Sequence, residues 1–347
     1  LVGSEMCIRD RKTTDLLISR NLPGSAGFSS TYYNQGSLNN KGVEFSLNAQ
    51  IIDSSSWKWS VSGNIGVNRN EISDLGLLPA DFGCLGERVG YYGNSLGDHF
   101  GVGHIFLAGE APGLFYGYVT QGIVQKEDIT ENGIKYIKQD GSVGYYQTVN
   151  KTTPVAGDVK YVDRNGDGVV DDNDRDIIGN PNPDFTYGFQ TKVSWKSLSL
   201  SASFNGVQGR DILNVGNRYN NTPGTKSNNV TRKAFQNMWT DENPSNLYPK
   251  STFVVQNMVM DRYVEDGSYL RCSDITLSYV LPAKWTNKIG IKNTSVYASV
   301  KNAFVITDYS GYDPEVNSFA FDGLRPGVDM NSYPTPRSFV FGLNLTF

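Results

Sequence analysis

The last eleven residues of the chain, 337–347, alternate between apolar and polar side chains. Successive side chains of a β-strand point to opposite faces, so this alternation predicts a strand with one apolar and one polar side. Only Val340 departs from the pattern. The apolar side would consist of Phe339, Phe341, Leu343, Leu345 and Phe347. The polar side would consist of Ser338, Gly342, Asn344 and Thr346.

Segments with the same period of two recur along the chain, and Gly, Pro, Asn and Asp residues separate them. The pattern predicts about ten strands, at 12–20, 41–53, 57–70, 97–109, 115–125, 185–195, 198–208, 268–281, 294–305 and 337–347. The two segments at 97–109 and 115–125 are the least regular. For any one segment alone, a soluble strand with one buried face is the simpler explanation.

The connections between the predicted strands alternate in length, and this alternation favours a membrane barrel. Short joins are predicted at 53–56, 110–114, 196–197 and 282–293. Long, polar connections are predicted at 21–40, 71–96, 126–184, 209–267 and 306–336. Short turns at one rim and long loops at the other are typical of bacterial outer-membrane barrels. A soluble sandwich has no reason to sort its loops in this way.

The tryptophans support the same interpretation. Trp57, Trp59, Trp195 and Trp285 lie at or beside the short joins, where an aromatic girdle would meet the membrane interface. Trp239 is the exception, since it lies in a long connection. The sequence therefore predicts an all-β fold, a partial antiparallel up-and-down transmembrane β-barrel with long extracellular loops and short periplasmic turns.

Composition is compatible with such a barrel. Only 38% of the residues are hydrophobic, and the mean hydropathy is −0.38, so the chain lacks the roughly 20 continuous apolar residues of a membrane helix. A barrel of alternating strands has an average hydropathy that resembles that of a soluble protein. The net charge of −4 argues against nucleic acid as a partner.

The first eleven residues (LVGSEMCIRDR) have neither the apolar segment nor the cleavage site of a signal peptide. They resemble a translated sequencing adapter, so we expect 1–11 to be a non-native leader and 12–347 to be the barrel part of a longer protein. An ordinary frayed terminus is the alternative.

Several motifs along the chain point to one family. They are NNKGVE at 39–44, FYGY at 115–118, GIVQ at 122–125, GDVKY at 157–161, IGNPNP at 178–183, FTYGF at 185–189, EDGSYLR at 265–271 and YSGYDPE at 309–315. In these motifs and their order the chain resembles the C-terminal barrel portion of SusC/RagA-type TonB-linked outer-membrane transporters.

The resemblance implies a 22-stranded barrel of which this chain holds less than half. It also implies import of oligosaccharides or oligopeptides across the bacterial outer membrane, with a SusD-like surface lipoprotein as lid. Energy would come from TonB through an N-terminal region and plug that 12–347 lacks, so the chain alone should not transport. No cofactor is required by this role, and we expect no enzymatic activity.

One acidic segment matches a calcium-binding loop. Residues 163–174 (DRNGDGVVDDND) follow the EF-hand spacing, with a carbonyl at the seventh position and Asp in place of the usual final Glu. The expected Ca²⁺ ligands are Asp163, Asn165, Asp167, Val169, Asp171 and Asp174. The alternative is a turn whose carboxylates bond their own backbone and hold no ion.

Aromatic side chains in the long connections could stack on sugar rings or contact peptide side chains and the lid. The candidates are Tyr32, Tyr33, Tyr91, Tyr92, Tyr145, Tyr146, Trp239, Phe319 and Phe321. Packing within the loops is the alternative for each of them.

The terminal strand has a second expected role. An amphipathic strand that ends on an aromatic residue resembles the signal read by the outer-membrane assembly machinery, with Phe347 as its key residue. Anchoring in the lipid bilayer at the membrane interface is the alternative, and both roles are compatible.

Motifs for catalysis are missing from the sequence, which contains no GxSxG, HExxH or nucleotide-binding fingerprint. The two histidines, His99 and His104, lack the Cys or carboxylate partners of a zinc site. The competing interpretation of the whole chain is a secreted, Ca²⁺-binding β protein that recognises carbohydrate.

Overall fold

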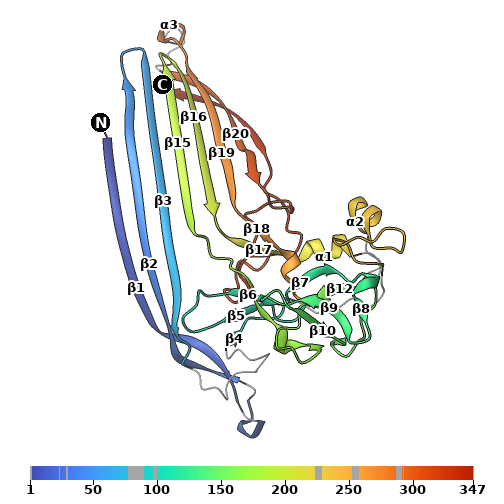
Figure 1. The fold of residues 1–347 in the computed structure, drawn as a ribbon. Coiled ribbons are helices and arrows are strands. Elements are labelled where there is room, and N and C mark those ends of the chain that lie inside the picture. The colour runs from blue at the N-terminus through green and yellow to red at the C-terminus, as the bar shows by residue number, and fades with distance from the viewer. Residues whose placement is uncertain are drawn as a thin grey trace.

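Eight long strands form one antiparallel sheet, called the wall below (Figure 1). The structure is a computed structural model that describes residues 2–22, 24–28, 30–76, 90–96, 100–222, 229–251, 258–286, 291 and 293–346. The wall strands are β1 (Val2–Asn21), β2 (Ser30–Asp53), β3 (Trp57–Asp74), β15 (Phe185–Trp195), β16 (Leu198–Gln208), β19 (Tyr269–Val280), β20 (Asn293–Thr307) and β22 (Ser338–Thr346). Their spatial order follows the chain, so the wall has the predicted up-and-down topology.

The apolar side of the wall is exposed. Phe45, Phe189, Leu277 and Phe341, from four different strands, are 41%, 45%, 46% and 80% accessible. In a soluble sandwich these side chains would converge on a shared packed centre. Instead they cover the outer surface of an open, curved sheet, as lipid-facing residues of a barrel do.

Strand register aligns these apolar residues into continuous rows. One row runs across seven strands, because each member is paired with the next. It consists of Ile52, Trp59, Val193, Leu200, Leu277, Ala298 and Phe341. A shift of one residue at any strand would turn its apolar side to the opposite face, so the shared pattern fixes the register.

The short joins meet at one rim of the wall, and the long connections leave the other (Figure 1). At the short-turn rim the rings of Trp57 and Trp195 stack with their centroids 5.8 Å apart. The indole of Trp59 donates a hydrogen bond to Thr191 over 3.0 Å. Trp285 lies in α3 (Ala283–Thr286), which follows β19. The predicted grouping of the four tryptophans at this rim is confirmed.

The fold class is confirmed, but the wall contains eight strands in place of about ten. Segments 97–109 and 115–125 were wrongly assigned to the wall, and the join at 110–114 is not a wall turn. Their described residues lie within one connection from β3 to β15, where 104–106, 114–117 and 120–123 are strands of small sheets. All of β5 (His104–Phe106) and all of β6 (Leu114–Gly117) are buried, so these strands lie inside a core and lack a lipid-facing side.

The structure also shifts two predicted boundaries. β1 begins at Val2 and pairs with β2 along the segment predicted as a leader. Pairing does not test where that segment comes from, so the leader stays a prediction. The predicted loop at 21–40 is shorter, because β2 starts at Ser30.

Besides the join of β1 and β2, three connections lie at the long-loop rim, and these three, 75–184, 209–268 and 308–337, are called the loop region. Its four-stranded sheet contains β4 (Tyr91–Tyr92), β5, β6 and β14 (Asp176–Gly179). A three-stranded sheet contains β8 (Ile129–Thr130), β9 (Gly133–Ile137) and β10 (Val143–Tyr146). Another joins β17 (Asp211–Asn214), β18 (Val264–Asp266) and β21 (Val328–Asp329). Two pairs complete it: β7 (Thr120–Ile123) with β12 (Val159–Tyr161), and β11 (Thr148–Val149) with β13 (Val169–Val170).

The helices are short. The loop region holds α1 (Val215–Asn221) and α2 (Arg232–Asn237). Single 3₁₀ turns occur at η1 (Gly24–Ala26), η3 (Lys126–Asp128), η4 (Asp172–Asp174) and η5 (Asp261–Tyr263). Within the described ranges, no helix has both the length and the apolar character needed to span a membrane.

The main hydrophobic core lies in the loop region. It draws buried side chains from all three connections, including Phe115 and Tyr161, Leu213 and Met260, and Val328. Because the connections share one core, they form a folded body and not separate loops.

Candidate functional site

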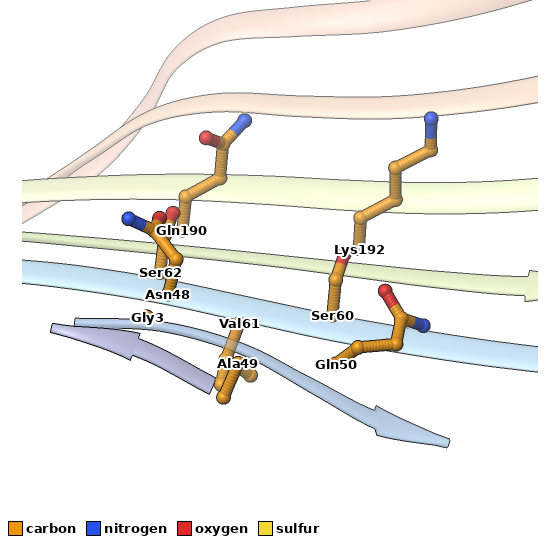
Figure 2. A pocket seen from close by; sticks show the side chains of 9 residues that line it. All are labelled: Gly3, Asn48, Ala49, Gln50, Ser60, Val61, Ser62, Gln190 and Lys192. Carbon is orange, nitrogen blue, oxygen red and sulfur yellow. The ribbon is translucent and has the colours of Figure 1, made fainter. Parts of the chain in front are cut away.

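The polar side of the wall forms a continuous surface of hydroxyl, amide and charged side chains. Figure 2 shows Gln190 and Lys192 on one side of the strands and Ala49 and Val61 on the other. A cavity of about 390 Å³ lies against the polar side. Its polar lining consists of Asn48, Gln50, Ser60, Ser62, Gln190 and Lys192 (Figure 2).

Further along the same surface, β19 and β20 hold a charged cluster. Asp274 accepts hydrogen bonds from Thr276 and Ser299, each over 2.7 Å, and pairs with Lys301 at 2.6 Å. These groups satisfy one another, so they give the surface polarity without leaving an unpaired buried charge.

The loop region folds over the long-loop end of this polar side (Figure 1). Residues 313–315 contact wall side chains that point the same way as the polar surface: Asn205 donates to Glu315 over 3.1 Å, and Tyr269 donates to Glu315 over 2.7 Å. Because the loops fold over the polar face, that face is the interior of the barrel and the apolar face is its exterior.

A buried ion pair fixes this arrangement. Arg271 of β19 lies 2.5 Å from Asp313, and both side chains are 6% exposed. Asp313 also accepts hydrogen bonds from the backbone of Glu315 and of Thr335, over 2.9 and 3.1 Å. Burial alone would raise the pKa of Asp313, but those hydrogen bonds and the charge of Arg271 together lower it. The pair thereby ties the motif at 309–315 to the motif at 265–271.

The acidic segment at 163–174 forms a compact turn. The buried carboxylate of Asp163 accepts from the N–H groups of Gly166 and Gly168, over 2.7 and 2.9 Å. The carboxylate of Asp174, also buried, accepts from the N–H groups of Arg164, over 2.7 Å, and Asp171, over 2.8 Å. Burial raises the pKa of Asp174 to about 6 against the effect of these hydrogen bonds.

The remaining predicted ligands complete the same turn. Asp167 accepts from Val169 N–H and from the amide of Asn165, while Asp171 caps η4 through Asn173 N–H. In the part of the chain that the structure describes, no group of three or more His, Cys, Asp or Glu side chains is placed to hold a metal. The described geometry matches the alternative of backbone-bonded carboxylates, and Ca²⁺ binding stays a prediction.

Calorimetric titration tests that prediction. If the loop binds Ca²⁺, the wild-type chain should give heat with millimolar affinity, and Asp167→Ala should abolish it, because it removes an exposed candidate ligand. Asp140→Ala, which removes an exposed carboxylate from a different turn, should leave the heat unchanged. Absence of heat in the wild type would eliminate the site.

The nine aromatic candidates differ in exposure. Tyr32 is 72% exposed, Tyr145 is 38% exposed, and Phe321 is fully exposed. The half-buried candidates are Tyr33, Tyr91, Tyr92 and Phe319. Tyr146 and Trp239 are buried, so they do not present a ring to a ligand. A contact role stays a prediction for the seven others.

Strand geometry explains why neighbouring tyrosines separate. Tyr145 and Tyr146 are adjacent in β10, so one must point outward and the other inward. Tyr146 packs against Tyr136 with ring centroids 5.9 Å apart. Trp239 donates its indole N–H to Gln125 over 2.9 Å inside the loop region. Sequence reasoning also missed two exposed loop tyrosines, Tyr312 at 70% and Tyr333 at 90%, although Tyr312 lies within the motif at 309–315.

The terminal strand has the predicted form. In β22 the side chains of Phe339, Phe341, Leu343 and Leu345 are exposed on the apolar side of the wall. Phe347, the predicted key residue of the assembly signal, lies outside the described residues. Recognition by the assembly machinery stays a prediction.

His104 should make the loop region sensitive to acid. Its Nε2 lies 2.9 Å from the Pro326 carbonyl oxygen, and burial lowers its pKa to about 4. In the unfolded chain a histidine takes up a proton near pH 6.5, whereas folded His104 stays neutral until about pH 4. The folded state is therefore fully stable with respect to this group above pH 6.5 and loses stability as pH falls toward 4. Between pH 7.5 and pH 5 the contribution of His104 to the free energy of unfolding should drop by about 2 kcal/mol.

Hydrogen exchange of residues 104–116 in this pH range measures that drop. In His104→Gln the side-chain amide can still donate to the Pro326 carbonyl but does not titrate, so the variant should lack the contribution of about 2 kcal/mol from His104, and any pH dependence that remains comes from other groups such as Asp174. Equal pH dependence in the variant and the wild type would show that another group is responsible.

Comparison with known proteins agrees with the geometry. No protein-family model matches the chain. TonB-dependent receptor P26 of Formosa agariphila is 31% identical over 355 residues, which cover 100% of this chain and 33% of that protein. TonB-dependent receptor SusC of Bacteroides thetaiotaomicron is 32% identical over 347 residues, which cover 97% of this chain and 29% of that protein.

Solved structures lead to the same family. The RagAB peptide importer in its open-open state superposes with a TM-score of 0.70 and 27% identity, over 100% of this chain and 33% of that chain. The chain thus spans about a third of the length of its relatives. A secreted carbohydrate-binding protein is not favoured, because the apolar side of the wall is exposed and the relatives are receptors and importers. The chain belongs to the SusC/RagA-type TonB-dependent receptors and forms part of their transmembrane β-barrel.

Proposed function

We propose that this chain is part of an outer-membrane importer that takes up oligosaccharides or oligopeptides and has no catalytic role. The two-sided wall is the observation that supports this most. Its apolar exterior suits hydrocarbon, and its polar interior, with Gln190 and Lys192 beside the cavity, offers hydrogen bonds along a path for a polar nutrient. Relatives named as receptors and a peptide importer support the same role.

The remaining partners follow from this proposal. A SusD-like lipoprotein would close the extracellular mouth against the loop region and the adjoining end of β2, where the exposed aromatic rings of Phe321 and Tyr32 are available for contact. TonB would supply energy through the N-terminal part of the importer. The outer-membrane assembly machinery would insert the barrel by reading β22.

Uptake by cells tests the proposal. A strain in which the gene is deleted should lose growth on either a neutral oligosaccharide mixture or tryptic peptides as sole carbon source, and the gene restored in trans should recover it. The lipoprotein should copurify with the receptor in detergent. Unchanged growth on both nutrients after deletion would contradict the proposal.

A further inference from the structure

A second cavity, of about 530 Å³, lies in the loop region between α1, α2 and the connection 308–337. This volume is within the range of small-ligand sites. Five asparagines line it, together with Tyr248, Tyr312 and a few other polar residues. No aliphatic side chain is among the described lining residues. The lining therefore offers hydrogen bonds and aromatic faces but little for an apolar side chain of a peptide.

One side of the cavity is held rigidly. Glu265 accepts hydrogen bonds from Asn214, Asn217 and Ser310, each over 2.9 Å. Its second oxygen accepts the backbone N–H of Ser310 over 2.9 Å. These bonds occupy the carboxylate and fix the neighbouring amides, so the surface is organised before a ligand arrives.

Other groups in the lining remain available. Among the described residues, none forms a hydrogen bond with the side-chain amide of Asn220 or Asn331. The same is true of the hydroxyl of Tyr248, a residue that is only 8% exposed. An added Cβ at Gly216 would overlap the side-chain oxygen of Asn331, so a glycine is needed to let this amide sit against α1. Each amide can both donate and accept, as sugar hydroxyls do.

Tyr312 supplies a flat surface at the same cavity, with 70% of the residue exposed. The charged lining residues are Glu265, whose oxygens are engaged, and one lysine, Lys233. The described lining thus has one charge of each sign and gives no preference for an ionic ligand.

We propose that this cavity is a binding subsite for a neutral, hydroxyl-rich sugar ring, which stacks on Tyr312 and hydrogen-bonds to the free amides of Asn220 and Asn331. The inference rests on the proposed import function and narrows its substrate to oligosaccharides. It also assigns a role to the motif at 309–315, which carries Tyr312.

The first measurement is binding of the complete receptor, purified in detergent, to an array of neutral oligosaccharides. The strongest binder is then titrated calorimetrically against variants. Tyr312→Ala should weaken binding at least tenfold and Tyr312→Trp should preserve it, because the stacking surface is lost in one and kept in the other. Asn220→Ala should weaken binding about fivefold, the effect of one hydrogen bond.

Matched controls separate the cavity from the rest of the surface. Tyr333→Ala removes an exposed tyrosine from the same connection, and Asn132→Ala removes an asparagine of the β8–β9 turn; neither should change affinity. Failure of every neutral oligosaccharide to bind, or affinity unchanged in both Tyr312→Ala and Asn220→Ala, would overturn the proposal.

Two outcomes distinguish the subsite from the import function. If the cavity variants weaken binding of hexaalanine in place of sugar, the sugar assignment is overturned while import stands. If the receptor binds sugar through Tyr312 but the deletion strain grows unchanged on both the oligosaccharide mixture and the tryptic peptides, the import role fails while the subsite stands.

Discussion

Replacing Asp313 with alanine should lower the free energy of unfolding by about 3 to 5 kcal/mol, because it leaves the Arg271 guanidinium buried without its closest counter-ion. The substitution also removes the acceptor for the backbone N–H groups of Glu315 and Thr335. Glu315 lies 3.4 Å from Arg271 and is more exposed, so it should compensate only in part. Urea titration of the chain in detergent micelles measures the loss, and proteolysis within 308–337 should accelerate.

Asp308→Ala is the matched control, since it removes an exposed carboxylate five residues earlier in the same connection. Its stability should remain within about 0.5 kcal/mol of the wild type.

The lowered pKa of Asp313 also makes the stabilisation by the Arg271–Asp313 pair depend on pH. The stabilisation is present above the unfolded pKa of about 4 and is lost as pH falls through the lower folded pKa, so wild type and Asp313→Ala should converge in strong acid. Equal stability of the two at pH 7 would show that the ion pair does not hold the loops to the wall.

Phe189→Arg should cost about 2 to 4 kcal/mol in phospholipid vesicles, because it would place a charge near the middle of a lipid-facing strand. Phe189 is 45% exposed and lies well inside β15, with Phe204 opposite on β16. Leu277→Arg should cost less, since Leu277 is only three residues from the short-turn end of β19. Urea-induced unfolding from vesicles measures both changes.

Gln190→Arg supplies the comparison, because this residue is next to Phe189 but points into the interior. Its cost should be below about 1 kcal/mol, since a charge in the polar interior remains hydrated. An equal loss of stability in Phe189→Arg and Gln190→Arg would show that Phe189 does not face hydrocarbon.

The wall was predictable from sequence because one face of every strand meets lipid and the other meets a polar interior. Because of that contrast, apolar and polar residues alternate with a period of two, most clearly in β15, β16 and β22. The loop region lacks such a contrast: β5 and β6 are buried on both sides, so their sequences alternate least regularly and do not show whether a strand belongs to the wall or to a core.

The site was only partly predictable for a related reason. Motifs at 265–271 and 309–315 could be read in the sequence, but nothing in their spacing indicates that Arg271 and Asp313 form a buried pair. The exposure of the loop aromatic side chains could not be predicted either, because it depends on how the connections pack into the shared core. Trp239 is buried, whereas Tyr312 is largely exposed at a cavity. Such long-range packing is not encoded in a local pattern.

Spin labels offer the most direct test of the two-sided wall. In the receptor with its native cysteines replaced, a label at position 45, 189 or 341 should be relaxed by oxygen dissolved in the bilayer and shielded from a water-soluble nickel complex. Labels at nearby interior positions 46, 190 and 344 should show weaker oxygen relaxation and stronger nickel relaxation. Greater nickel than oxygen accessibility at 45, 189 and 341 would contradict the assignment of the apolar face to lipid.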